Sequence, residues 1–113
     1  MLNADEALAS LRARADADFL APPEDYEPGR HTADVADLGL RVTLTRSRYP
    51  NRPGGLDCYA VTISTIDVDR PPGEPSVRRA LEACFGPAAA AAQPRPGGPR
   101  VRMFRLPASA LGG

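Results

Sequence analysis

Two stretches of alternating apolar and polar residues, joined by a short turn, constrain the fold more than any other feature of the sequence. In residues 38–49, LGLRVTLTRSRY, an apolar residue occupies every even position up to Leu44. In residues 56–66, LDCYAVTISTI, the odd positions from Tyr59 to Ile63 are apolar. A period of two is typical of a β-strand with one face toward a core. The intervening YPNRPGG is rich in turn-forming residues, so the pattern predicts a β-hairpin.

The alternation breaks after Leu44, where arginines take the positions that would face the core. Arg46 and Arg48 occupy the next two even positions. A guanidinium group buried without a partner would be strongly destabilising. We therefore predict that the end of the hairpin leaves the core and carries Arg46, Arg48 and Arg52 near its exposed tip.

A helix and a last strand are predicted after the hairpin. Residues 75–85, PSVRRALEACF, place apolar residues at the spacing of one buried helix face. The alanine- and proline-rich residues 88–96 leave helix, strand and coil open. The following RVRMFRLP predicts a strand in which Val101 and Met103 share the core-facing side and Phe104 lies on the other.

The N-terminal third combines a helix with an irregular acidic segment. Asn3 and Glu6 have the spacing of a capping box, which predicts a helix over about residues 4–20. Its thin apolar stripe docks either on the rest of the chain or on a second copy, which would make a homodimer. The stripe consists of Leu8, Leu11, Ala15 and Phe19. Residues 21–37 are rich in proline, glycine and acids, and we predict an acidic linker there.

These elements predict an α+β fold in four parts. Residues 1–20 form an N-terminal amphipathic helix and residues 21–37 an acidic, proline-rich linker. Residues 38–106 form a small domain in which a hairpin, a helix and a strand make an antiparallel sheet with a helix on one face. Residues 107–113 form a disordered tail. The predicted core comprises Leu40, Val42, Leu44, Val61, Ile63, Leu81, Phe85 and Met103.

The charge of the chain is polarised although its formal net value is zero. Residues 1–37 hold nine acids and three arginines, whereas residues 38–113 hold five acids and eleven arginines. Such asymmetry indicates a charged partner, or an acidic segment that folds over a basic surface. No stretch approaches the roughly 20 apolar residues that span a membrane, and no signal-peptide pattern begins the chain, which predicts a cytoplasmic protein without membrane contact.

The sequence argues against an enzyme. Serine and cysteine nucleophiles need a neighbouring base, yet the only histidine, His31, lies in the predicted linker. Cys58 and Cys84 are too few and too far apart for a zinc site, so we interpret them as reduced core cysteines. No phosphate-binding glycine motif opens a helix. We therefore expect no catalytic residue, no metal and no cofactor.

The order of elements from residue 69 onward resembles a family of small uncharacterised phage and bacterial proteins. That family has a strand, an Asp-Arg-x-Pro motif, a helix ending in an aromatic residue, a proline-rich stretch and a final strand. The matching residues here are Asp69, Arg70, Pro72, Phe85, Pro94, Pro96 and the strand Val101–Leu106. The closing segment departs from the family in having no histidine or tryptophan. The resemblance implies an α+β fold and an origin in a mobile element, and it carries over no site.

Two binding hypotheses remain beside the simpler one that the arginines only solvate the outer faces of two strands. In the first, a protein with an acidic surface binds the arginine-rich edge of the sheet, with this chain acting as an accessory protein or inhibitor. In the alternative, the same arginines bind the phosphates of a nucleic acid, with Tyr49 and Phe104 as the only candidates for base stacking. A pI near 6.6 favours the protein partner. The predicted binding residues are Arg41, Arg46, Arg48, Tyr49, Arg52, Arg100, Arg102 and Arg105.

Overall fold

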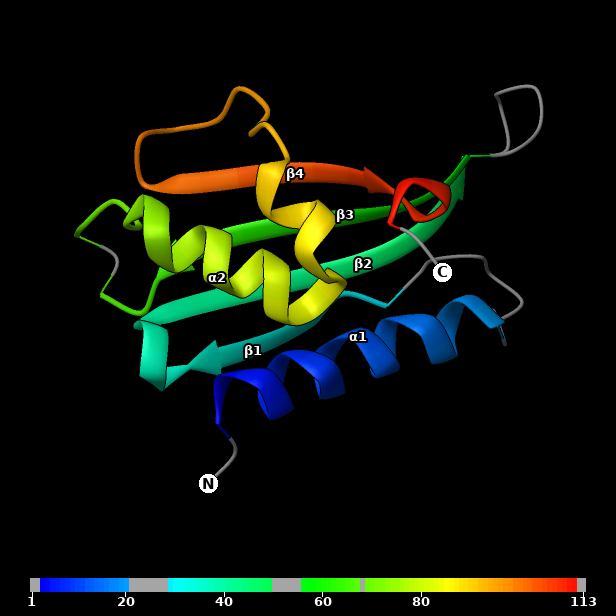
Figure 1. Cartoon of the computed structure of the whole chain (residues 1–113), viewed down its shortest axis with the longest axis horizontal. Coiled ribbons are helices and arrows are strands. Elements are labelled where there is room, and N and C mark those ends of the chain that lie inside the picture. Colours follow the sequence, from blue (N-terminus) through cyan, green and yellow to red (C-terminus); the bar gives the residue numbers. More distant parts are fainter. Residues whose placement is uncertain (1–2, 21–28, 50–55, 68, 112–113) are drawn as a thin grey trace.

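The computed structural model describes residues 3–20, 29–49, 56–67 and 69–111, with side chains at all of these positions except 19, 20, 47–49, 56 and 110. Within these residues, four antiparallel strands form one sheet in the order β1-β2-β3-β4, and two α-helices cover one face of it (Figure 1). The α+β class is confirmed. The elements are α1 (Ala4–Leu20), β1 (His31–Val35), η1 (Ala36–Leu38), β2 (Leu40–Tyr49), β3 (Leu56–Thr65), α2 (Glu74–Phe85), η2 (Pro87–Ala91), β4 (Val101–Pro107) and η3 (Ala108–Ala110), where η marks a 3-10 helix.

The predicted hairpin is confirmed as β2 and β3. Val42 lies opposite Ile63, and Leu44 lies opposite Val61. These four side chains face the helices and are at most 2% exposed, because the even positions of β2 and the odd positions of β3 fall on the same face. The apolar face of helix α2 belongs to the same core, and its Leu81 is 1% exposed.

Helix α1 docks on the same chain. Leu8, Leu11 and Ala15 are almost completely buried and belong to the same core as α2 and the sheet. The start of the helix is capped from two sides, since Asn3 Oδ1 accepts a hydrogen bond from the Glu6 amide at 2.8 Å and Asp37 accepts one from the Ala4 amide at 3.3 Å. The docking of the predicted apolar stripe on the rest of the chain is thus confirmed for Leu8, Leu11 and Ala15, and the side chain of Phe19 lies outside the described part.

The predicted linker is wrong over its second half. Residues 31–35 form the edge strand β1, which pairs with β2 along its whole length. Val35 is buried, and the acid Asp34 points outward into a two-pronged ion pair with Arg41 across the ladder. The two described acids of the predicted linker, Asp34 and Asp37, therefore both have partners. Residues 21–28 lie outside the described part of the chain.

The predicted face of the last strand is also wrong. Met103 is 42% exposed, whereas Phe104 and Leu106 are buried against the helices. The register with β3 explains this, because Phe104 lies opposite Val61 and Leu106 lies opposite Tyr59, both of which face the core. The predicted tail is ordered as far as described, since residues 108–110 form η3 and Leu111 packs against the core.

Candidate functional site

The predicted arginines do not form one surface, because the sheet separates them. Arg41 and Arg105 lie on the face that the helices leave open, whereas Arg46 and Arg102 lie on the helix-covered face, as the strand registers require. Arg100 lies in the turn that precedes β4. The single binding surface predicted from sequence is therefore split into at least two.

Three further predicted residues lie at the far end of the hairpin. Arg48 and Tyr49 are the last two residues of β2, and their side chains are outside the described part. Arg52 falls in the turn, among residues 50–55, which are also outside it. Their predicted role in binding stays a prediction.

Arg46 does not project from the hairpin. Its side chain is 17% exposed and lies between two carboxylates. Nε and Nη2 donate to the two carboxylate oxygens of Asp57 at 2.9 and 2.6 Å, and Nη1 donates to Oδ1 of Asp16 at 2.8 Å. The bond to Asp57 is the main cause of a raised Arg46 pKa. The prediction that this arginine leaves the core is wrong, because Asp16 in α1 and Asp57 in β3 neutralise it where it stands.

The same cluster ties α1 to α2 and to the sheet. The Tyr59 hydroxyl donates to Oδ1 of Asp16 at 2.5 Å, and burial together with this bond raises the pKa of Tyr59. The Arg12 guanidinium lies 5.4 Å from the centre of the Tyr59 ring, and its Nη1 donates to the Cys84 carbonyl at 3.2 Å. We call Arg12, Asp16, Arg46, Asp57 and Tyr59 the Arg46 cluster. Its charges compensate one another, so it stabilises the fold and does not favour an anionic ligand.

Arg41 is also neutralised. Its Nε and Nη2 donate to the two oxygens of Asp34 at 2.7 and 3.1 Å across the β1–β2 ladder. These bonds lower the pKa of Asp34. The open face of the sheet is therefore close to neutral at its β1 side.

The opposite side of the sheet is basic. Glu82 is the last acid of the chain, and four arginines follow it. We call these the β4 edge arginines: Arg95, Arg100, Arg102 and Arg105. The Arg95 amide donates to the Met103 carbonyl at 2.7 Å, which fixes the segment before β4 along the outer side of that strand. Four positive charges thus gather around one edge strand.

This edge differs from the rest of the molecule in how its charges are balanced. Among the described residues, Arg95, Arg100 and Arg102 make no ion pair with an acid. Arg14 and Arg30, elsewhere in the chain, also make no ion pair with a described acid. The charges of two of these arginines also affect a thiol in the neighbouring strand β3. Burial raises the pKa of the Cys58 thiol, while the charges of Arg105 and Arg95 act in the opposite direction.

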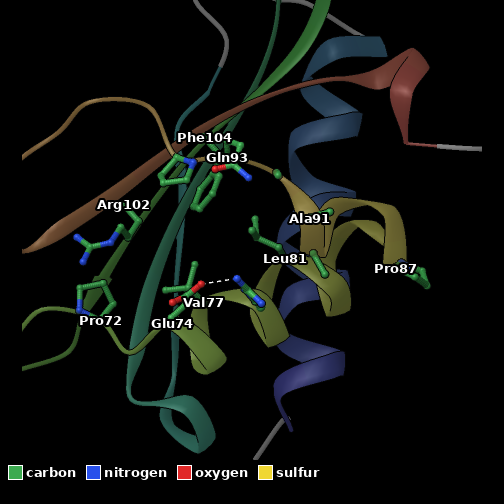
Figure 2. Close-up of a pocket in the computed structure, with 13 residues that line it drawn as sticks. Pro72, Glu74, Val77, Leu81, Pro87, Ala91, Gln93, Arg102 and Phe104 are labelled. Carbon is green, nitrogen blue, oxygen red and sulfur yellow. Dashed lines mark hydrogen bonds and ion pairs between the residues drawn. The ribbon is translucent and has the colours of Figure 1, made fainter.

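A groove of about 760 Å³ lies beside β4 on the helix-covered face (Figure 2). It runs between α2 and the segment that contains η2, and Arg102 and Phe104 of β4 line it. Glu74 and Arg78 of α2 form an ion pair at its border. The remaining lining is apolar apart from Gln93: Pro72, Val77, Leu81, Pro87, Ala90, Ala91, Ala92 and Pro94.

The aromatic rings that the structure describes are all buried. Tyr59, Phe85 and Phe104 are at most 5% exposed, and the first two pack against each other with their centres 5.0 Å apart. A ring that is at most 5% exposed does not offer the open face that base stacking requires. Phe104, one of the two residues predicted to stack on bases, is therefore not available for that role.

The reactive side chains named in the sequence are held in structural positions. Both cysteines are reduced and buried, and burial raises the pKa of Cys84 to about 12. His31 Nε2 lies 2.6 Å from a carboxylate oxygen of Asp18, which links β1 to α1. Among the described residues, no group of three histidine, cysteine or acidic side chains is placed to hold a metal. Neither α1 nor α2 combines the length and the apolar content that crossing a membrane requires.

No family model matches this sequence, and the searches of curated proteins and of solved structures return no match. Sequence reasoning missed Arg95 and the groove. The signal for Arg95 was present, since residues 83–113 contain arginines and no acid. The groove had no comparable signal, because it arises from the way α2 and η2 pack over β4.

Proposed function

We propose that this chain is a non-enzymatic binding protein that holds an acidic surface of a protein partner at the β4 edge arginines. One observation carries the proposal. Six described arginines are ion-paired within the chain, but Arg95, Arg100 and Arg102 have no acidic partner among the described residues although they lie around one strand. The six paired arginines are Arg12, Arg41, Arg46, Arg70, Arg78 and Arg79.

Two physical arguments support an acidic protein as the partner. The guanidinium group matches a carboxylate with two parallel hydrogen bonds, and an uncompensated cluster of such groups speeds and strengthens association with an anionic surface. A nucleic acid would offer the same charge but gains additional affinity from stacking, and the described rings are covered. The edge therefore suits carboxylates better than bases.

The test compares two matched double variants. R95Q/R100Q removes two exposed arginines of the β4 edge, and R14Q/R30Q removes two exposed arginines elsewhere that also lack an ion pair among the described residues. The probes are a fluorescein-labelled oligoglutamate peptide and an oligothymidylate of equal length, followed by fluorescence anisotropy at low salt and at physiological ionic strength, where charges are screened beyond about 8 Å.

We expect the wild type to bind oligoglutamate. Its affinity should fall about fivefold or more in R95Q/R100Q, a change that corresponds to about 1 kcal/mol, and less than about twofold in R14Q/R30Q. Equal losses in both double variants would show diffuse charge attraction without a site. Tighter binding of oligothymidylate than of oligoglutamate would reject the acidic protein partner in favour of a nucleic acid.

A further inference from the structure

The helical layer leaves part of β4 uncovered, and this creates the groove. Helix α1 lies along β1, α2 lies over the middle of the sheet, and the short η2 lies toward β4 (Figure 1). Val77 and Leu81 of α2 and Phe104 of β4 line the space between α2 and η2. The η2 wall is built mostly of alanines, whose side chains end at Cβ and leave the space open.

Arg102 places a positive charge at one end of this apolar space (Figure 2). Its Nη1 donates to the carbonyls of Pro99 and Val101 at 3.0 and 3.2 Å, which holds the guanidinium without neutralising it. Among the described residues, Nε and Nη2 of Arg102 make no hydrogen bond. These two nitrogens form the side of a guanidinium group that can donate to both oxygens of a carboxylate. The groove lining contains two arginines against the single acid Glu74, so it favours an anion.

From this combination we infer that the groove receives an apolar side chain of the acidic partner while Arg102 binds a carboxylate next to it in the partner's sequence. The inference rests on the proposed function and specifies the ligand: a short extended protein segment in which an apolar residue stands beside aspartate or glutamate. A volume of about 760 Å³ lies in the range of pockets that hold small ligands, which suits a few residues of extended chain and not a whole helix.

The experiment fills the groove without touching the arginines. Ala91 is exposed and lines the groove, and Ala88 is exposed in the same 3-10 helix but does not line it. A91W therefore occupies the groove, and A88W is its matched control. The probes are two capped, fluorescein-labelled oligoglutamate peptides that differ at one central position, which is leucine in one and serine in the other.

We expect the wild type and A88W to bind the leucine peptide about fivefold or more tightly than the serine peptide. In A91W this preference should disappear while affinity for the serine peptide stays within about twofold of wild type, since the charges are unchanged. Circular dichroism and the unfolding midpoint show whether A91W is folded. A methyl NMR titration of the wild type gives a result that does not depend on the variant, because the methyl signals of Val77 and Leu81 should shift with the leucine peptide and not with the serine peptide.

The two proposals fail in different ways. Equal affinity of wild type for both peptides, a preference retained by folded A91W, or methyl signals that respond alike to both peptides would overturn the groove while leaving the acidic partner of the β4 edge in place. Absence of any oligoglutamate binding, or binding that R95Q/R100Q does not weaken, would overturn the proposed function itself.

Discussion

Replacing Arg46 by glutamine should destabilise the fold strongly, although sequence reasoning placed this arginine at an exposed tip. Glutamine keeps much of the aliphatic stem and removes the charge. Asp16 and Asp57 would then remain as two neighbouring carboxylates without their shared cation. The contact of Asp16 in α1 with the sheet would lose its ion pair and keep the hydrogen bond from the Tyr59 hydroxyl.

The magnitude follows from burial. Removing one partner of a fully buried ion pair costs about 3 to 5 kcal/mol. The Arg46 side chain is 17% exposed and each carboxylate is 30% exposed, so water can partly solvate the carboxylates in the variant. We therefore expect a loss of about 2 to 3 kcal/mol in the free energy of unfolding. For a domain of this size that corresponds to a fall of about 8 to 12 °C in the unfolding midpoint.

The assay is equilibrium unfolding in urea followed by far-ultraviolet circular dichroism, with R41Q as the control. Arg41 also makes a two-pronged bond to an aspartate, but both side chains are exposed, and R41Q should leave the midpoint nearly unchanged. A free energy of unfolding for R46Q within about 0.5 kcal/mol of wild type would refute the reasoning, because ordinary surface substitutions fall in that range. Loss of stability in R41Q equal to that in R46Q would show that burial is not the cause.

Two further predictions concern the core. L81A should lower the free energy of unfolding by about 2 to 5 kcal/mol, because Leu81 is 1% exposed. M103A changes an exposed position of β4 and should lower it by less than about 1 kcal/mol in the same urea titration. A larger effect of M103A would contradict the described face of β4. The pKa of Cys84 is raised from 9.0 to about 12, so the folded state keeps this proton to higher pH than the unfolded state, and the free energy of unfolding should fall as pH rises above about 9. Iodoacetamide should leave this thiol unmodified in native protein at pH 8, as measured by mass spectrometry. Rapid alkylation would show that α1 does not cover the thiol.

Long periodic segments were predictable because the face of each element that packs on the core must carry apolar residues, and this produces the periodic pattern in the sequence. The alternation in β2 up to Leu44 and in β3 from Tyr59 to Ile63, and the helical spacing of α2, each leave one face apolar. Strand β1 is only five residues long, and its outward Asp34 makes sense only once Arg41 stands opposite it. Local composition therefore suggested a linker.

The misplaced side chains have a different origin. In β4 both phases carry apolar residues, so periodicity could not decide between Met103 and Phe104, and only the register with β3 does. Arg46 looked unpaired because its partner Asp16 lies 30 residues away in a helix whose position the sequence does not state. The β4 edge arginines were named in part from sequence, since an acid-free segment is visible there, but their division between two faces needed the strand register.

The position of α1 has a consequence for how the protein folds as it is synthesised. Strands β1 and β2 each pair with the next strand along the chain across a short connection, which favours fast folding, whereas β4 joins β3 only after α2 and η2. Helix α1 instead meets α2 across long separations: Arg12 bonds the Cys84 carbonyl 72 residues later, and the Cys84 thiol bonds the Leu8 carbonyl 76 residues earlier. During translation Leu8 and Leu11 are made well before α2, which supplies part of the surface that buries them. The apolar stripe of α1 therefore stays partly uncovered until α2 has been made, and over that interval it needs protection from aggregation.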